Sequence, residues 1–227
     1  MPERVQEVRA RIAAAAARAG RNVADITLLA VSKAQPADSV RAAAAAGLTD
    51  FGESYLNEAL GKLEALAGLT LTWHFIGRLQ ANKTRPIAER FQWVHGLERL
   101  HIGERLSGQR PVHAPPLNVC IQVNLAGEAS KGGVAPAQLL ELAAALAALP
   151  RLRLRGLMCI PPVERDPERQ RAWFARLRKL YEALNAQGAG LDTLSMGMSA
   201  DFESAILEGA TVVRIGAALF GVRSPLA

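Results

Sequence analysis

The sequence predicts a single α/β domain, residues 1–227, that folds as a (β/α)8 TIM barrel. Short apolar runs alternate with longer segments of helical period, which is the pattern of repeated strand–helix units around a parallel sheet. A chain of 227 residues suffices for one such core and leaves no room for a second large domain. An open nucleotide-binding sheet is disfavoured, because VSKAQP follows the first strand in place of a Gly-x-Gly-x-x-Gly turn.

The expected elements follow one another in a regular order. An Ala-rich segment with charges at helical intervals predicts an opening helix at 3–19. Eight short apolar segments predict strands at 27–32, 48–51, 72–76, 92–95, 117–123, 154–159, 191–194 and 211–215. The Ala- and Leu-rich segments between them predict helices at 37–46, 53–66, 80–89, 97–107, 136–148, 167–186 and 200–208. Pro136 and Ser199 are suited to helix starts, and Gly47 and Gly188 to helix ends.

Charge and cysteine content argue against several classes of protein. The net charge of +6 comes from arginines scattered along helical segments, so a nucleic-acid partner is not expected. The first 20 residues mix charges into the apolar pattern, which predicts a cytoplasmic protein without a membrane partner. Cys120 and Cys159 lie in apolar runs, where a thiol packs as a small hydrophobe, and no disulfide is expected. A metal site is not expected either, since ligand spacing does not join the four histidines, His74, His95, His101 and His113.

Lys33 has a position that suggests chemistry. It follows the first predicted strand, in register with Leu29 and Val31, so its ammonium is expected at the carboxyl-terminal face, where barrels carry their active sites. Partial desolvation there favours the neutral amine that attacks an aldehyde. From position alone, a lysine that simply extends into solvent is the alternative.

The loops after the last two predicted strands suggest a phosphate site. In SMGMS (195–199), the backbone amides of Met198 and Ser199 are expected beside a helix start, which attracts anions. Gly216 follows the eighth strand, and a residue without a β-carbon lets backbone amides approach a phosphate. A simple helix cap at Ser199 and a simple turn at Gly216 are the alternatives. Together with Lys33, these loops would hold a small phosphorylated aldehyde, which describes pyridoxal 5'-phosphate (PLP).

Six motifs occur in the order found in a known family. They are AVSK at 30–33, FGESYLNE at 51–58, WHFIGRLQANK at 73–83, GLMCIPP at 156–162, LSMGMSADFESAI at 194–206 and VRIGAALFG at 213–221. On these motifs the chain resembles the pyridoxal phosphate homeostasis proteins over about residues 33–221. The resemblance implies a fold like the N-terminal barrel of alanine racemase.

The resemblance also implies that PLP is the cofactor and that Lys33 holds it as a Schiff base. Arg214 would face the pyridine nitrogen, and because a guanidinium has only hydrogen-bond donors, it favours an unprotonated ring nitrogen and a weaker electron sink. A surface ion pair is the alternative for Arg214. The cofactor-binding residues expected in this way are Lys33, Met198, Ser199, Arg214, Gly216 and Ala217.

Three positions depart from the family pattern. Ser54 stands where asparagine is usual, and Arg78 stands where proline is common and receives no functional interpretation. Ala217 replaces a hydroxyl residue found in many members. The phosphate can still accept the Ala217 amide, but one hydrogen bond worth roughly 1.5–3 kcal/mol would be missing.

Two functions follow from this reading. The first is a monomeric PLP-binding protein for intracellular PLP homeostasis, not an enzyme, which passes the cofactor to PLP-dependent apoenzymes. The second is a PLP-dependent amino-acid racemase or related enzyme, which needs a second base opposite Lys33. Only Tyr55 and Tyr181 offer phenols, Tyr55 near the functional rim and Tyr181 well inside a predicted helix.

Lys131 suggests a further hypothesis. It lies in GEASKGG, a glycine-rich loop after the fifth predicted strand on the same face of the barrel. A lysine there would accept PLP transiently during cofactor exchange. A solvated loop lysine is the alternative.

Overall fold

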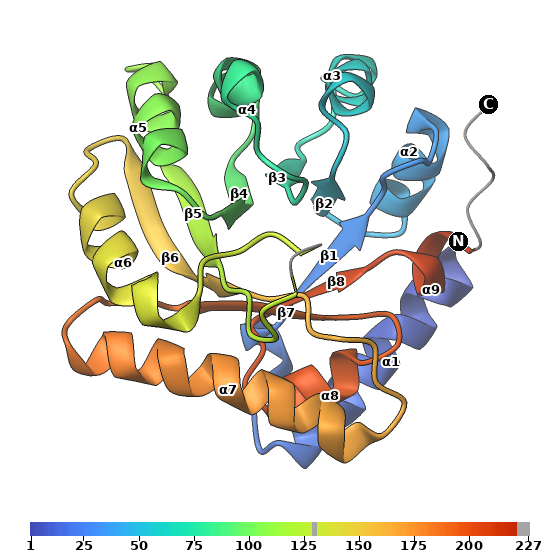
Figure 1. Cartoon of the computed structure of the whole chain (residues 1–227). Coiled ribbons are helices and arrows are strands. Elements are labelled where there is room, and N and C mark those ends of the chain that lie inside the picture. The colour runs from blue at the N-terminus through green and yellow to red at the C-terminus, as the bar shows by residue number, and fades with distance from the viewer. Residues whose placement is uncertain (129–130, 222–227) are drawn as a thin grey trace.

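A computed structural model describes residues 1–128 and 131–221. Eight parallel strands follow one another around a closed barrel, and the pairing of the last strand with the first completes the ring (Figure 1). The predicted (β/α)8 barrel is confirmed. The strands are β1 (Thr27–Val31), β2 (Asp50–Glu53), β3 (Thr72–Phe75), β4 (Trp93–Leu97), β5 (Leu117–Gln122), β6 (Leu152–Met158), β7 (Thr193–Met198) and β8 (Val212–Ile215).

Helices surround the barrel on its outer side, as Figure 1 shows. They turn their apolar positions toward the strands, for example Phe174 and Leu177 of α7. The α-helices are α1 (Pro2–Arg18), α2 (Ala37–Ala45), α3 (Leu56–Ala65), α4 (Thr84–Arg90), α5 (Leu100–Gln109), α6 (Leu139–Ala147), α7 (Pro167–Ala186), α8 (Phe202–Leu207) and α9 (Ala217–Phe220). Short 3-10 turns are η1 (Val23–Asp25), η2 (Ala81–Lys83) and η3 (Pro136–Gln138).

Three boundaries differ from the sequence prediction in ways that affect the functional face. Strand β2 continues to Glu53, which was expected in the following helix, because Glu53 pairs with Phe75 in the ladder with β3. A buried ammonium compensates the Glu53 carboxylate. Strand β7 runs four residues further than expected, to Met198. Helix α8 begins at Phe202 with Asp201 as its N-cap, so the predicted helix start at Ser199 is wrong. The Asp201 side chain instead accepts the Met198 amide, which keeps 198–201 in a turn.

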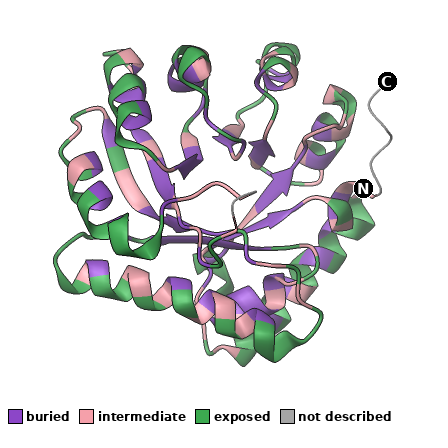
Figure 2. Cartoon of the chain, viewed as in Figure 1, coloured by how far each residue is buried: buried purple, intermediate pink, exposed green. Residues whose placement is uncertain are grey.

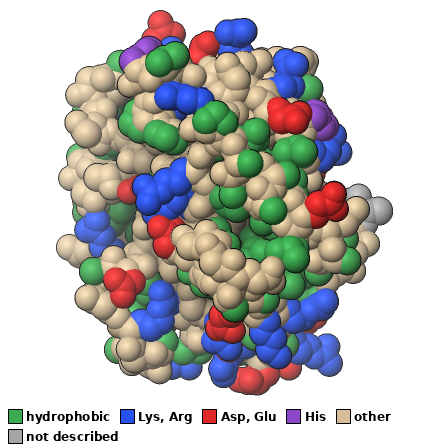
Figure 3. Space-filling model, turned by 90° about the vertical axis from the view of Figure 1, so that its left-hand side faces the viewer, with side chains coloured by type: hydrophobic (Ala, Val, Ile, Leu, Met, Phe, Trp, Pro, Cys, Tyr) green, Lys and Arg blue, Asp and Glu red, His purple; other side chains and the backbone are tan. Residues whose placement is uncertain are grey.

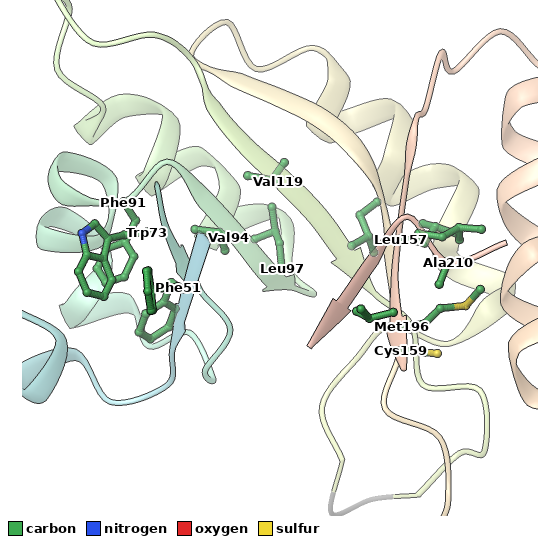
Figure 4. Close-up of a cluster of buried hydrophobic side chains, with 14 of the residues drawn as sticks. Phe51, Trp73, Phe91, Val94, Leu97, Val119, Leu157, Cys159, Met196 and Ala210 are labelled. Carbon is green, nitrogen blue, oxygen red and sulfur yellow. The ribbon is translucent and has the colours of Figure 1, made fainter. Parts of the chain in front are cut away.

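The core lies between the strands and the helices, where buried residues form an almost continuous layer (Figure 2). Aromatic side chains fill one side of it: Phe51 and Trp73 have ring centroids 5.8 Å apart (Figure 4). Phe75 meets Phe91 edge-on, with ring centroids 5.4 Å apart. Burial of each such side chain contributes roughly 1.5–3 kcal/mol. Gly156 permits the close contact of β6 with β7, since a β-carbon there would lie 1.7 Å from the Thr193 carbonyl oxygen.

One face of the molecule mixes charges of both signs. On the face shown in Figure 3, Lys and Arg side chains are interspersed with Asp and Glu and with apolar side chains. Such a distribution differs from the continuous basic stripe of nucleic-acid-binding proteins. Within 1–128 and 131–221, no helix has the length and apolar character needed to cross a membrane.

Candidate functional site

Two adjoining cavities open at the carboxyl-terminal ends of the strands, the end of a barrel that carries active sites. The smaller has a volume of about 260 Å³ and is lined by Val31, Lys33, Ser54, Ile76, Met158, Ile160, Met198, Ser199, Ala200, Arg214, Gly216 and Ala217. The larger has a volume of about 580 Å³ and is lined by Lys33, Ser54, Tyr55, Leu56, Asn57, Phe75, Ile76, Gly77, Arg78, Gln80 and Lys83. Lys33, Ser54 and Ile76 line both cavities.

The smaller cavity brings together every residue that the sequence analysis assigns to cofactor binding. Lys33 comes from the turn after β1, and Met198 and Ser199 from the end of β7. Arg214 lies in β8, and the two residues after that strand, Gly216 and Ala217, also line the cavity. The cavity is therefore lined by Lys33 after β1 and by the loops after β7 and β8, and these three strands are consecutive in the closed barrel.

The turn that carries Lys33 is held from both sides. Ser32 is fully buried, and its hydroxyl donates a hydrogen bond of 2.6 Å to Glu53 Oε1. Ala34 has a φ of +58°, an uncommon value for a residue with a β-carbon, and its amide donates to Glu58 Oε1 at 2.7 Å. These contacts fix the backbone immediately before and after Lys33.

Lys62 joins these two carboxylates. Its Nζ donates to Glu53 Oε1 at 2.7 Å, to Glu58 Oε1 at 2.5 Å and to the Ser32 backbone oxygen at 2.6 Å. Burial raises the pKa of Glu53, although Lys62 and the Ser32 hydroxyl act in the opposite direction. We refer to Ser32, Glu53, Glu58 and Lys62 as the lysine-support cluster. This cluster was not predicted from the sequence, because Glu53 was expected in a helix.

Arg214 is buried and held by three acceptors. Its NH1 donates to the Ser195 carbonyl oxygen at 2.6 Å and to Ser195 Oγ at 3.0 Å, and its NH2 donates to the Cys159 carbonyl oxygen at 2.9 Å. Burial lowers the pKa of Arg214, with Cys159 and Asp201 acting in the opposite direction. None of the ion pairs within 1–128 and 131–221 involves Arg214, so the alternative of a surface ion pair does not hold.

The β7 and β8 loops meet at Ser199. The Ser199 Oγ accepts a hydrogen bond of 3.4 Å from the backbone amide of Ala218, which lies in the first turn of α9. The two loops therefore contact each other. The Met198 amide, which was expected to face an anion, donates to Asp201 Oδ1 at 2.6 Å. Burial raises the pKa of Asp201, and its hydrogen bond from Met198 lowers it. Met198 thus reaches the cavity without offering its amide.

Four other residues considered in the sequence analysis have separate positions. Tyr55 is exposed at the N-cap of α3 and lines the larger cavity together with Arg78. The Tyr181 hydroxyl donates to the Leu191 carbonyl oxygen at 2.7 Å, away from both cavities. Lys131 lines neither cavity: its Nζ contacts Glu128 Oε1 and the Pro161 carbonyl oxygen, each at 2.9 Å. Positions 129 and 130 of its predicted loop lie outside the described residues.

Comparison with known proteins identifies the family. The family model of the alanine racemase N-terminal domain matches residues 4–224. The pyridoxal phosphate homeostasis protein of Pseudomonas aeruginosa is 62% identical over 221 residues, which cover 97% of this chain and 95% of the relative. The chain belongs to the pyridoxal phosphate homeostasis protein family. The Escherichia coli K12 protein of the same description is 50% identical, with 96% of this chain and 94% of the relative covered.

The solved structure of a relative has the same fold and contains bound PLP. PipY of Synechococcus elongatus, solved with PLP bound, is 36% identical to this chain and superposes with a TM-score of 0.86. The match covers 97% of this chain and 99% of PipY. The resemblance inferred from the six sequence motifs is therefore confirmed.

Proposed function

We propose that this chain binds PLP in the smaller cavity and serves intracellular PLP homeostasis as a carrier of the cofactor. The observation that carries the proposal is the convergence of Lys33, Arg214 and the β7–β8 loops on one cavity. The bound PLP of PipY and the descriptions of the bacterial relatives support it.

The residues of the smaller cavity fit the chemistry of this cofactor. Lys33 offers an amine, Arg214 a buried guanidinium and Ser199 a hydroxyl, whereas no carboxylate occurs among the described residues that line the cavity. An anionic phosphate is accordingly compatible with the lining. The volume of about 260 Å³ suits a single-ring molecule, since pockets for drug-sized ligands measure roughly 300–1,000 Å³.

Each side chain has a distinct role in this proposal. PLP, when bound, supplies an aldehyde that condenses reversibly with a primary amine, and Lys33 would provide that amine in a Schiff base. Ser199, Gly216 and Ala217 would hold the phosphate, and Met198 would border it with its side chain. Arg214 would donate to the ring nitrogen and keep it unprotonated, because a guanidinium cannot accept a proton there.

A carrier role agrees better with the geometry than catalysis does. Racemisation by two bases requires a second acid or base opposite Lys33. Tyr181 is tied to Leu191, and Tyr55 lies at the exposed rim. We further propose that residues 1–227 act as one monomeric cytoplasmic domain, with PLP-dependent apoenzymes as partners and neither nucleic acid nor membrane among them.

Reductive labelling tests the Schiff base. Borohydride treatment of the PLP complex should fix a pyridoxyl group on Lys33, detected by peptide mass spectrometry, and Lys33→Ala should lose both the label and the visible absorption of the complex. Lys83→Ala, which changes a lysine of the larger cavity only, is the matched control. Retention of the spectrum in Lys33→Ala with the principal label elsewhere would refute the assignment.

Steady-state turnover distinguishes the carrier from an enzyme. A panel of amino acids should show no substantial racemisation, transamination or decarboxylation by the PLP-saturated protein, since a rim open to water denies the reaction a dry, preorganised site. Turnover that depends on Lys33 at an ordinary enzymatic rate, on the order of 1 s⁻¹ or faster, would favour the racemase-like alternative.

A further inference from the structure

Behind Arg214, buried polar side chains cross the barrel interior from one end to the other. Asp50 is the first residue of β2, and His74 lies in β3. His95 lies in β4, and Ser195 lies in β7. The residues share no sequence motif, and only barrel closure brings them together. We refer to Asp50, His74, His95 and Ser195 as the interior chain.

Continuous hydrogen bonds join the interior chain. His74 Nε2 lies 3.0 Å from Asp50 Oδ1, and His74 Nδ1 lies 2.9 Å from His95 Nε2. His95 Nδ1 lies 2.7 Å from Ser195 Oγ, and that oxygen accepts NH1 of Arg214 at 3.0 Å. The chain therefore ends on the guanidinium that borders the smaller cavity.

Asp50 at one end of the interior chain and Arg214 at the other fix which atom donates in each hydrogen bond. An Asp50 carboxylate only accepts, so His74 Nε2 carries a hydrogen, and its other nitrogen, if the ring is neutral, accepts from His95 Nε2. His95 Nδ1 then accepts the Ser195 hydroxyl, whose oxygen is left to accept from Arg214. All donors point toward Asp50, and both histidines are neutral Nε2–H tautomers.

Burial agrees with this arrangement. His74 and His95 are almost completely buried, whereas Asp50 is partly exposed at the amino-terminal end of the barrel. Burial lowers the pKa of His74, although Asp50 acts in the opposite direction. Burial, together with the nearby His74 and Arg214, lowers the pKa of His95 well below its usual value. Trp93 stacks on His74 with ring centroids 5.5 Å apart and packs against one face of the ring.

We propose that Asp50, His74, His95 and Ser195 are positioning residues that orient Arg214 toward the smaller cavity through one unidirectional hydrogen-bond chain. The role in PLP binding rests on the proposed function, because it requires Arg214 to donate to the ring nitrogen. The arrangement of hydrogens is a property of the protein alone. A fixed Ser195 oxygen holds NH1, while the Cys159 carbonyl oxygen holds NH2, so the guanidinium plane cannot rotate.

Nitrogen NMR of the PLP-free protein tests the chain independently of any ligand. Near neutral pH, His74 and His95 should both give the spectrum of the neutral Nε2–H tautomer. The exposed histidines His101 and His113 provide reference signals outside the interior chain. A protonated ring or an Nδ1–H tautomer at either buried position would overturn the proposed direction of the hydrogen bonds.

Ser195→Ala tests the effect on Arg214, because it removes the hydroxyl and leaves the Ser195 backbone contact with NH1. The Kd for PLP should rise about two- to tenfold, the range expected for one such hydrogen bond. The signal of isotopically labelled PLP ring nitrogen should move toward the position of an unbonded nitrogen. Ser204→Ala, which removes another buried hydroxyl that contacts Gln170, is the matched control and should change neither.

The outcomes separate the two proposals. If the protein binds no PLP, the proposed function fails, yet the histidine tautomers remain measurable. If PLP binds and Ser195→Ala leaves both the Kd and the ring-nitrogen signal unchanged, the positioning role is refuted and the proposed function stands.

Discussion

Lys62 and Ser32 lie 30 residues apart in the sequence, and Lys62 Nζ donates a 2.6 Å hydrogen bond to the Ser32 backbone oxygen. Because Ser32 directly precedes Lys33, a buried ammonium on α3 supports the turn that carries Lys33. The same ammonium neutralises the Glu53 carboxylate, which is fully buried. Support of Lys33 and compensation of a buried charge thus depend on one side chain.

Lys62→Met should therefore lower the free energy of unfolding by about 3 kcal/mol, the cost of leaving a buried carboxylate without its partner. Urea unfolding measures the change. Adding Glu53→Gln should restore part of the loss, since the uncompensated charge is removed. Lys179→Met on the exposed face of α7 is the matched control. An equal, small effect of Lys62→Met and Lys179→Met would contradict the importance of the cluster.

The buried histidines predict a pH-dependent stability. Because the pKa values of His74 and His95 are lowered in the folded protein, the unfolded chain binds more protons below its own histidine pKa of about 6.5. The stabilisation is complete above that value and is lost as the pH falls. For His95, the free energy of unfolding should decrease by about 1 kcal/mol between about pH 7.5 and 5.5.

Glu53 affects the pH dependence of stability in the opposite sense, because its pKa is raised and its contribution to the free energy of unfolding is lost as the pH rises. Comparison of variants separates the contribution of His95 from that of Glu53. Urea unfolding at the two pH values should show a smaller pH dependence in His95→Gln than in the parent protein. His101→Gln, at an exposed position, should behave like the parent. A His95→Gln variant with the parent's pH dependence would argue against a neutral buried His95.

Ser199 and Arg214 should affect cofactor retention in different ways. Ser199→Ala removes a hydroxyl proposed to contact phosphate, so binding of both PLP and pyridoxamine phosphate should weaken about tenfold. Arg214→Gln removes the proposed ring contact and should change the absorption spectrum of the PLP complex or its pH dependence. Titration calorimetry and absorption spectra distinguish these results. Unchanged affinity and spectra in both variants would remove the proposed cofactor site.

Lys131 provides a test of cofactor exchange. We expect Lys131→Ala to slow PLP transfer to an apoenzyme, because a lysine on the loop that follows β5 would accept PLP transiently during exchange. The Lys131 ammonium contacts Glu128 and the Pro161 carbonyl oxygen. Recovery of apoenzyme activity measures the transfer rate, with Lys179→Ala as control. A rate equal to that of the parent protein would show that Lys131 takes no part.

The sequence could predict the barrel, because strand order places the carboxyl-terminal ends of all strands at one face. Strand order also pointed to Lys33, Met198, Ser199 and Gly216, whereas Arg214 and Ala217 were expected only through the family resemblance. It could not place the interior chain, since His74 and His95 are 21 residues apart and His95 and Ser195 are 100 apart. Their contact depends on strand register and barrel closure. The apolar neighbours hid the signal, because each of 72–75, 93–97 and 193–198 contributes a single residue to the interior chain, namely His74, His95 and Ser195.

The pairing of β8 with β1, which begins at Thr27 and Val212, has a consequence for synthesis of the chain. Until the ribosome has delivered residues 212–215, β1 and β7 have no neighbour on one side, and exposed strand edges promote association with other chains. The ring closes only when nearly the whole sequence is available. Truncation before β8 should consequently yield aggregation-prone material rather than a smaller folded unit.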